Sequence, residues 1–314
     1  MCGSNDIVKQ DGLFVCQYCG CKYTVEEAKK MMDDAVSVKI DTSETIGNYA
    51  ALAQNAFDSG NYIDAEKYCN KYMEADLNSH KIWLLKGKTV GIQSTPDNNR
   101  LYEALNIFSK AIELSGEEEK EKAISESQLG LVAGVEQLIQ KRIELLYPSP
   151  NVEICKGFKS DIALVKNLVR DSFIKAHIKT FGIVNTCAAM AINKGILETW
   201  YKVFAKYTSP SFVPTVLSYR SFLTEGDLLI DILSQSISLC NPPADDRSSE
   251  ILFETYDLMI RIQSAMLAPG GARTAYLRNM PIRHEDEVLS PIIAKDYRER
   301  IRVWTDLRDK YSKQ

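Results

Sequence analysis

The sequence has few of the residues that interrupt helices, with only 10 prolines and 16 glycines among its 314 residues. Both residue types disfavour the interior of a helix, so their scarcity predicts long helices and an all-α protein. No apolar run approaches the roughly 18 residues that a membrane-spanning helix needs, and the N-terminus lacks the pattern of a secretory signal peptide. We therefore expect no membrane association and a cytoplasmic location.

Residues that commonly carry catalysis or bind metals are also scarce. The three histidines, His80, His177 and His284, form no His-x-x-x-His or Glu-x-x-His pattern. No serine or cysteine nucleophile motif is accompanied by a matching base. These absences predict a non-enzymatic protein. An enzyme in the C-terminal half, which resembles no known family, is an alternative to the two functions described below.

Half of the eight cysteines fall within the first 21 residues, and the other half are scattered along the chain. The scattered cysteines lie on apolar faces of expected helices, where a thiol serves as a small hydrophobic side chain. This usage predicts buried free thiols in a reducing compartment at Cys69, Cys155, Cys187 and Cys240.

The N-terminal cysteines have the spacing of zinc knuckles. Residues 16–20 form a Cys-x-x-Cys-Gly knuckle, and Cys2-Gly3 has the form of the end of a second one. Between them, Asp-Gly separates two short β-prone runs, which predicts a hairpin over 7–15 that brings the knuckles together. We predict a structural zinc ion held by Cys2, Cys16 and Cys19, because so small a unit folds only around its metal.

A tetrahedral zinc site needs a fourth ligand. The cysteine that would complete the first knuckle belongs three positions before Cys2, ahead of Met1. We expect that Met1 is an internal methionine of a longer gene product or that the site has decayed, so that this chain holds zinc weakly. Adding a cysteine and one further residue before Met1 is expected to give one tightly held zinc. Cys21 is an alternative fourth ligand, but it lies only two residues past Cys19, which is poor geometry for one site.

Small and large side chains alternate in a repeated helical pattern after this module. Small residues that let paired helices approach recur at Ala53, Ala65, Gly87 and Ala104, and large ones that fill the space between pairs at Tyr49, Phe57, Trp83 and Phe108. Tyr49 and Trp83 stand 34 positions apart, and Ala65 and Ala104 stand 39 apart. The second repeat therefore carries about five extra residues, which we place in the turn-rich stretch 94–99.

Residues 46–116 resemble two tetratricopeptide repeats, whose period is about 34 residues. The proline that usually ends such a repeat is absent, with Leu77 and Gly116 in its place. Taken with the cysteines, residues 2–116 resemble a group of bacterial proteins in which a zinc ribbon precedes tetratricopeptide repeats. The resemblance implies an adaptor-like architecture, and that group has no assigned activity to transfer.

The remaining sequence continues in helical patterns. At 45% hydrophobic residues, the chain is long enough for two or three packed units. We expect a zinc ribbon and short helix (1–32), a linker (33–45), two repeats (46–116), a helical region (117–268), an irregular connection (269–290) and a charged helix (291–314). Within the later parts we expect helices over 117–147, 152–172, 176–207, 216–240, 248–267 and 291–313. The helical region is either a set of degenerate repeats or a separate bundle.

Repeat geometry leads to a prediction of function. Stacked helical pairs leave a groove along their first helices, and such a groove holds a peptide or a helix of a partner protein. The polar groove positions that we predict are Asn48, Gln54, Asn55, Lys86 and Lys88.

A nucleic-acid-associated factor that uses the zinc ribbon and the basic C-terminal helix is the alternative function. The net charge of −4 does not favour nucleic-acid binding. The last helix, however, carries arginines around aromatic residues, at Arg298, Arg300, Arg302 and Arg308. Acidic residues alternate with them, which indicates pairing within the helix instead. The salt dependence of binding separates the two functions, because phosphate contacts weaken steeply with salt.

Overall fold

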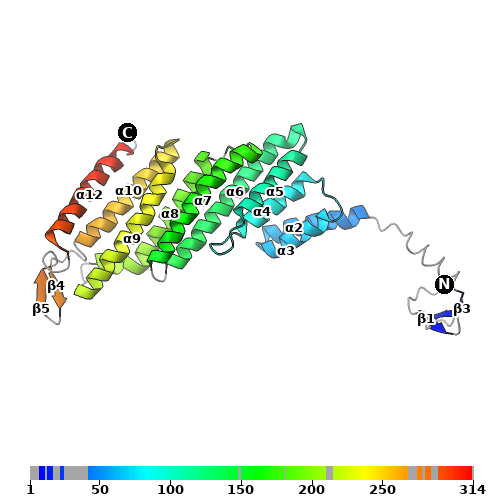
Figure 1. Ribbon diagram of the computed structural model, residues 1–314, viewed down its shortest axis with the longest axis horizontal. Helices are drawn as coiled ribbons and strands as arrows, with labels where there is room; N and C mark the ends of the chain where they lie inside the picture. Colours follow the sequence, from blue (N-terminus) through cyan, green and yellow to red (C-terminus); the bar gives the residue numbers. More distant parts are fainter. Residues whose placement is uncertain are drawn as a thin grey trace. The chain divides into compact units, whose positions relative to one another are not determined.

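The structure is a computed structural model, and it describes residues 7–10, 13–16, 22–24, 42–147, 150–179, 181–209, 215–267, 274–277, 280–283 and 289–312. Two compact units, Met1–Ala51 and Leu52–Gln314, make up the chain. Helices account for most of the described residues, which confirms the all-α prediction (Figure 1). No helix in the described part of the chain is long and apolar enough to cross a membrane.

The first unit contains a small antiparallel sheet of β1 (Ile7–Gln10), β2 (Leu13–Cys16) and β3 (Lys22–Tyr23). Gln10 lies opposite Leu13, so the predicted hairpin forms, with two residues connecting its strands. β3 pairs with the other edge of β2, an addition that the sequence pattern did not predict. The short helix expected over 25–32 lies outside the described residues.

The second unit is built mainly from consecutive helices. The division between the units falls within α2 (Thr42–Asp58). The α-helices after it are α3 (Tyr62–Met73), α4 (His80–Ile92), α5 (Leu101–Leu114), α6 (Glu117–Leu146), α7 (Val152–Ala176), α8 (Phe181–Thr199), α9 (Val216–Cys240), α10 (Asp246–Leu267) and α12 (Pro291–Lys310).

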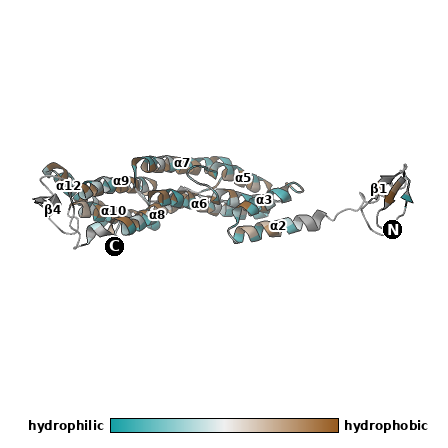
Figure 2. Cartoon of the chain, turned by 90° about the horizontal axis from the view of Figure 1, so that it is seen from below, coloured by the Kyte–Doolittle hydropathy of each residue, from teal (hydrophilic) through white to brown (hydrophobic). Residues whose placement is uncertain are grey.

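These helices stack in two rows. α4, α6, α8 and α10 each pack against the next member of one row, and α5, α7 and α9 do so in the other. Consecutive helices pack across the rows, and α12 packs on α10. Figure 2 shows α5, α7 and α9 lying along one side of α6, α8 and α10. In stacked helical hairpins, each helix contacts the next helix and the one after it. The helices after residue 117 make these contacts, so they extend the same stack.

A buried phenylalanine holds the first three helices of this stack together. Phe108 of α5 is fully buried, and its ring occupies space that side chains at Gly87 of α4 and Gly130 of α6 would need. A Cβ atom at either glycine would lie 2.5 Å from the ring. A Cβ atom at Gly134 would lie 3.0 Å from the carbonyl oxygen of Gly91, so α4 and α6 approach backbone to backbone. Glycine is needed at these positions because of that close approach.

Ion pairs also link helices of the stack. The connection between α4 and α5 contains the predicted insertion at 94–99, where the buried Ser94 hydroxyl accepts a hydrogen bond from the Arg100 N–H at 3.1 Å. The Arg100 guanidinium then binds Glu66 of α3 through two hydrogen bonds of 2.8 and 2.7 Å. This pairing lowers the pKa of the Glu66 carboxyl.

The long helical stretch predicted over 176–207 is present over 181–208, and only its predicted start is wrong. α7 ends at Ala176, and His177 has φ 53°, in the left-handed region that few residues other than glycine adopt. The chain turns there before α8 begins at Phe181, and it passes into π-helical geometry at Trp200–Phe204 and a 3-10 turn at Ala205–Thr208. A histidine gives no sequence signal for a helix end of this kind.

The irregular connection predicted over 269–290 is also wrong in part. It contains a β-hairpin of β4 (Thr274–Leu277) and β5 (Met280–Arg283), with Leu277 opposite Met280. Pro281 lies within the second strand, opposite Tyr276, because a two-stranded ribbon has an edge on which proline is tolerated. The glycines of 270–271 lie outside the described residues.

The four scattered cysteines are buried and free, as predicted. Burial raises the pKa of the Cys69 thiol to about 12 and those of Cys155 and Cys240 to about 11. The Cys187 thiol is shifted in the same direction for the same reason. A thiol of such high pKa is almost wholly protonated at neutral pH, so these side chains act as core residues and not as nucleophiles.

Candidate functional site

A hollow of 270 Å³ lies where the end of α2 meets the first halves of α4 and α6. Its apolar lining consists of Leu84 and Leu85 of α4, Ala123 of α6 and Phe57 of α2. The first three are buried and Phe57 is partly exposed. We call this hollow the groove. Because the first three side chains are buried, the groove has a small apolar floor, and most of its exposed lining is polar.

Charged residues surround this apolar surface. Lys81 of α4 and Lys122 of α6 are exposed at the edge. Lys88 of α4 reaches across to Glu126 of α6, and its Nζ atom donates a hydrogen bond to Oε2 at 2.7 Å. Glu119 adds a second carboxylate. Three lysines against two glutamates give the groove a small positive excess.

Local sequence sets the orientation of α4. Trp83 donates a hydrogen bond from its indole Nε1 to the carbonyl of Leu77 at 2.8 Å, which fixes the chain that leads into the helix. The small residues Gly87, Gly130 and Gly134 let α4 and α6 lie close enough for Lys88 to reach Glu126. The glycines that make room for the Phe108 ring therefore also position the two helices that line the groove.

The structure brings together two of the five groove residues predicted from the sequence. Gln54 and Lys88 both line the groove, and Gln54 donates a hydrogen bond to Asp58 at 2.8 Å. Lys86 instead lies over the Trp83 ring, with Nζ 6.0 Å from its centroid. Asn55 is exposed but is not among the described lining residues, and Asn48 is exposed on the part of α2 that belongs to the first unit.

The sequence prediction missed the wall that α6 supplies. Lys122, Ala123 and Glu126 belong to a segment outside the recognised repeats, so none was proposed as a groove residue. A usable signal was present: small residues recur along one side of the predicted helix 117–147, at Ala123, Ser127, Gly130 and Gly134, and all four are buried. That spacing is typical of a helix packed closely against a neighbour.

The predicted zinc ligands lie mostly outside the described residues. Cys2, Cys19 and Cys21 are not described, and Cys16 is the last residue of β2, opposite Ile7. Within the described ranges, no group of three or more histidine, cysteine, aspartate or glutamate residues is arranged to hold a metal. His284 also lies outside them, His80 lines the groove, and His177 ends α7.

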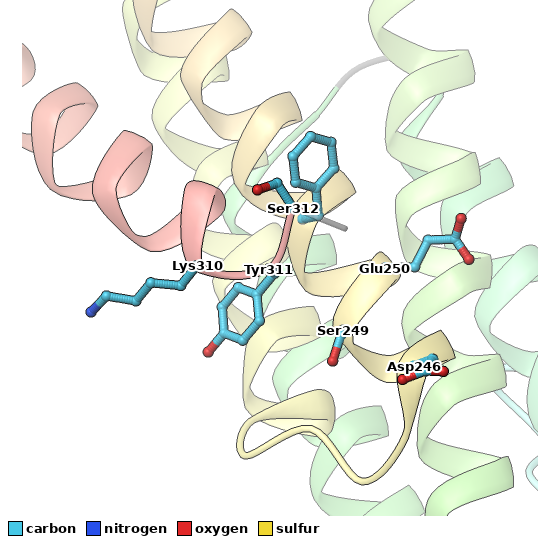
Figure 3. Close-up of a pocket in the computed structure, with 7 residues that line it drawn as sticks. Asp246, Ser249, Glu250, Lys310, Tyr311 and Ser312 are labelled. Atoms are coloured by element: carbon cyan, nitrogen blue, oxygen red, sulfur yellow. The ribbon is translucent and has the colours of Figure 1, made fainter. Parts of the chain in front are cut away.

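A larger hollow of 720 Å³ lies between the start of α10 and the end of α12. Figure 3 shows the Lys310 side chain extending away from Asp246 and Glu250 of α10. The charged groups therefore do not converge on a common point, and the hollow supports no particular chemistry. Its described lining residues are Asp246, Ser249, Glu250, Phe253, Lys310, Tyr311 and Ser312.

No family model matches this sequence, and no curated protein matches it at a significant level.

The arginines of the C-terminal helix are paired with carboxylates. Arg300 binds Asp296 at 2.8 Å and Arg302 binds Glu299 at 2.6 Å, both within α12. Arg308 binds Asp309 at 2.9 Å and reaches Asp257 of α10 at 3.2 Å. These pairs confirm the expected pairing along the helix and leave less positive charge for an external phosphate.

Proposed function

We propose that this chain is a non-enzymatic protein-binding adaptor whose groove holds a peptide or a helix of a partner. The observation that carries the proposal is the groove itself, which has an apolar lining from two stacked helices and a charged edge. The resemblance of residues 46–116 to tetratricopeptide repeats supports it, because those repeats bind partners along the corresponding helices. The same proposal places the chain in the cytoplasm, where buried free thiols stay reduced.

The lining of the groove suggests the chemistry of the bound segment. An apolar side chain of the partner would rest on Leu84 and Leu85, where it displaces water from an apolar surface. A carboxylate beside it would meet Lys81 or Lys122, both of which are exposed. Lys88, already paired with Glu126, would hold the two helices in register under the bound segment.

The test combines crosslinking with charge reversal in the full chain. A photo-crosslinking amino acid at position 54 is expected to trap a partner protein in cells, and one at position 110, on α5, is expected not to trap that partner. Lys81→Glu with Lys122→Glu should lower the yield at position 54 by about tenfold, because like charges then face the partner. Lys110→Glu, which removes an exposed pair with Glu113, is the matched control and should leave the yield unchanged. Equal yields for all these chains would contradict the proposal.

The nucleic-acid alternative rests on the zinc ribbon and on the arginines of α12, and the pairing of those arginines weakens it. Nuclease treatment before crosslinking distinguishes the two functions. A partner that survives nuclease, and whose binding changes little between low and moderate salt, supports the adaptor. Loss of all partners with nuclease, together with a steep salt dependence, would favour the alternative.

We propose in addition that the hairpin of β1 and β2 belongs to a structural zinc module that provides a further interaction surface. Cys16 at the end of β2, with Cys19 three residues later, supplies one Cys-x-x-Cys pair of thiolates. In the chain extended by a cysteine and one further residue before Met1, Cys16→Ser with Cys19→Ser is expected to lower the zinc content, measured by elemental analysis. Cys69→Ser with Cys240→Ser changes two buried thiols as the control and should leave zinc unchanged. Equal zinc in all three proteins would refute this assignment.

A further inference from the structure

A third hollow, of 660 Å³, lies where α7 ends and α8 begins. We call it the α7–α8 hollow. Val169 and Ile178 form its buried apolar part, while the neighbouring Phe173 and Ile174 are 54% and 64% exposed. Single exposed apolar residues are ordinary, but two bulky ones beside an apolar hollow of ligand-binding size indicate a docking surface.

The turn after α7 gives this hollow a fixed shape. His177 in the left-handed conformation donates its N–H to the carbonyl of Phe173 at 3.1 Å. Ile178 donates its N–H to the carbonyl of Ser172 at 3.2 Å, and its side chain is fully buried. Paired hydrogen bonds of this kind close the last turn of a helix and anchor the next residue against it. The hollow is thus preformed in the free chain.

Positive charge surrounds the α7–α8 hollow. Lys166, Arg170 and Lys179 line it and are exposed, and none of its described lining residues is acidic. Lys166 donates a hydrogen bond to Ser238 of α9 at 3.3 Å, and Arg170 binds Asp171 at 3.0 Å, so both cations are held at the edge. The chain as a whole carries a net charge of −4, so this local positive charge is a property of the site.

We propose that the α7–α8 hollow docks an amphipathic segment of a partner protein, with apolar side chains in the hollow and acidic residues on either side of them. Apolar anchors at positions i, i+4 and i+7 of a helix suit such a surface. Carboxylates next to these anchors complement Lys166 and Lys179, because Arg170 is already paired with Asp171. A concave surface takes individual side chains, whereas a bilayer takes side chains that protrude, so the shape favours a peptide over an anionic membrane.

This surface is separate from the groove, because it is made by α7 and α8 and not by α2, α4 and α6. An adaptor with both sites holds two partners at once. Lys81→Glu with Lys122→Glu should therefore leave docking at the α7–α8 hollow unchanged, so a failure of the groove proposal and a failure of this one are separately visible.

The experiment selects peptides from a random phage-displayed library on the immobilised full chain. Two variants test where the selected peptides bind. Gly182→Trp fills the hollow, since a Cβ atom at Gly182 meets open space, and Phe173→Asp removes an exposed apolar wall. Val152→Asp, at a 53% exposed apolar position at the far end of α7, is the matched control. Both hollow variants should weaken the binding of the selected peptides by about tenfold or more, and the control variant should not.

The charge requirement is tested on the same peptides. Lys166→Glu with Lys179→Glu should weaken binding about tenfold, and Lys156→Glu, an exposed lysine at the start of α7, should not. The selected sequences should contain acidic residues beside spaced apolar ones. Selection of no such sequences, or equal binding to wild type and Gly182→Trp, would overturn the proposal. So would co-sedimentation with phosphatidylserine vesicles that Phe173→Asp abolishes, because the hollow would then be a membrane contact.

Discussion

Phe108→Ala is expected to lower the free energy of unfolding by about 3–5 kcal/mol, the range for removing a fully buried phenylalanine. The effect should lie at the upper end because the surroundings cannot collapse into the cavity. The ring lies against Gly87 and Gly130, which have no side chains that could move inward. Denaturant unfolding followed by circular dichroism measures the change. Phe173→Ala, at a residue 54% exposed, is the control and should change stability by no more than about 0.5 kcal/mol.

A double variant tests whether the Phe108 ring occupies the space that a side chain at Gly87 would need. Gly87→Ala introduces a Cβ atom 2.5 Å from the Phe108 ring and should be destabilising alone. Combined with Phe108→Ala, which removes all the ring atoms in conflict, its cost should be smaller than in the wild-type background. Additive effects of the two changes would mean that the ring and the glycine do not share this space.

The helices that sequence predicted best are those bounded by strong local signals. The helix predicted over 216–240 has the bounds of α9, where Thr215 accepts a hydrogen bond from the Ser218 N–H and forms a capping box. Proline, glycine and capping residues act within a few positions, so one sequence suffices to read them. The end of α7 depends instead on a histidine in the left-handed region, held by the packing of Ile178 beneath the turn. No local pattern encodes that contact.

Only part of the groove was predictable, for a related reason. Gln54 and Lys88 come from segments whose 34-residue spacing is visible in the sequence, whereas the wall of α6 comes from a helix of 30 residues that breaks the period. The α7–α8 hollow was not predictable at all, because Phe173 and Ile174 have the spacing of ordinary helix residues. Only the arrangement in space distinguishes an exposed apolar side chain at a hollow from one in a core.

Arg142→Met is expected to destabilise the protein by about 3–5 kcal/mol near neutral pH, because it leaves the carboxylate of Asp161 buried without its partner. Arg142 of α6 binds Asp161 of α7 through hydrogen bonds of 2.7 and 3.2 Å. The two side chains are 14% and 8% exposed, so water replaces the lost partner poorly. The cost should be read from denaturant unfolding of the full chain at several pH values.

The pH dependence of this cost has a definite sign. Burial raises the pKa of the Asp161 carboxyl, and Arg142 opposes that shift. The folded state therefore holds the proton more tightly than the unfolded state, and the stability contributed in acid is lost as pH rises through the folded pKa. Removal of Arg142 raises that pKa further. The cost of Arg142→Met should accordingly shrink as pH falls through the raised folded pKa, and it should level off well below about 3.9, the ordinary value for aspartate, where the carboxyl is neutral in both states.

A second change separates the charge from the packing. Arg142→Met with Asp161→Asn leaves no buried charge, so it should recover most of the stability that the single variant loses and should remove its pH dependence. Lys159→Met, which breaks the exposed pair with Asp231 at 3.0 Å, is the matched control and should cost no more than about 1 kcal/mol. If Arg142→Met cost as little as this control at every pH, α6 and α7 would be held together by their apolar contacts alone. If the double variant were no more stable than the single one, the loss would come from the space that the missing guanidinium leaves beside Gly157. An unpaired charge would then not explain it.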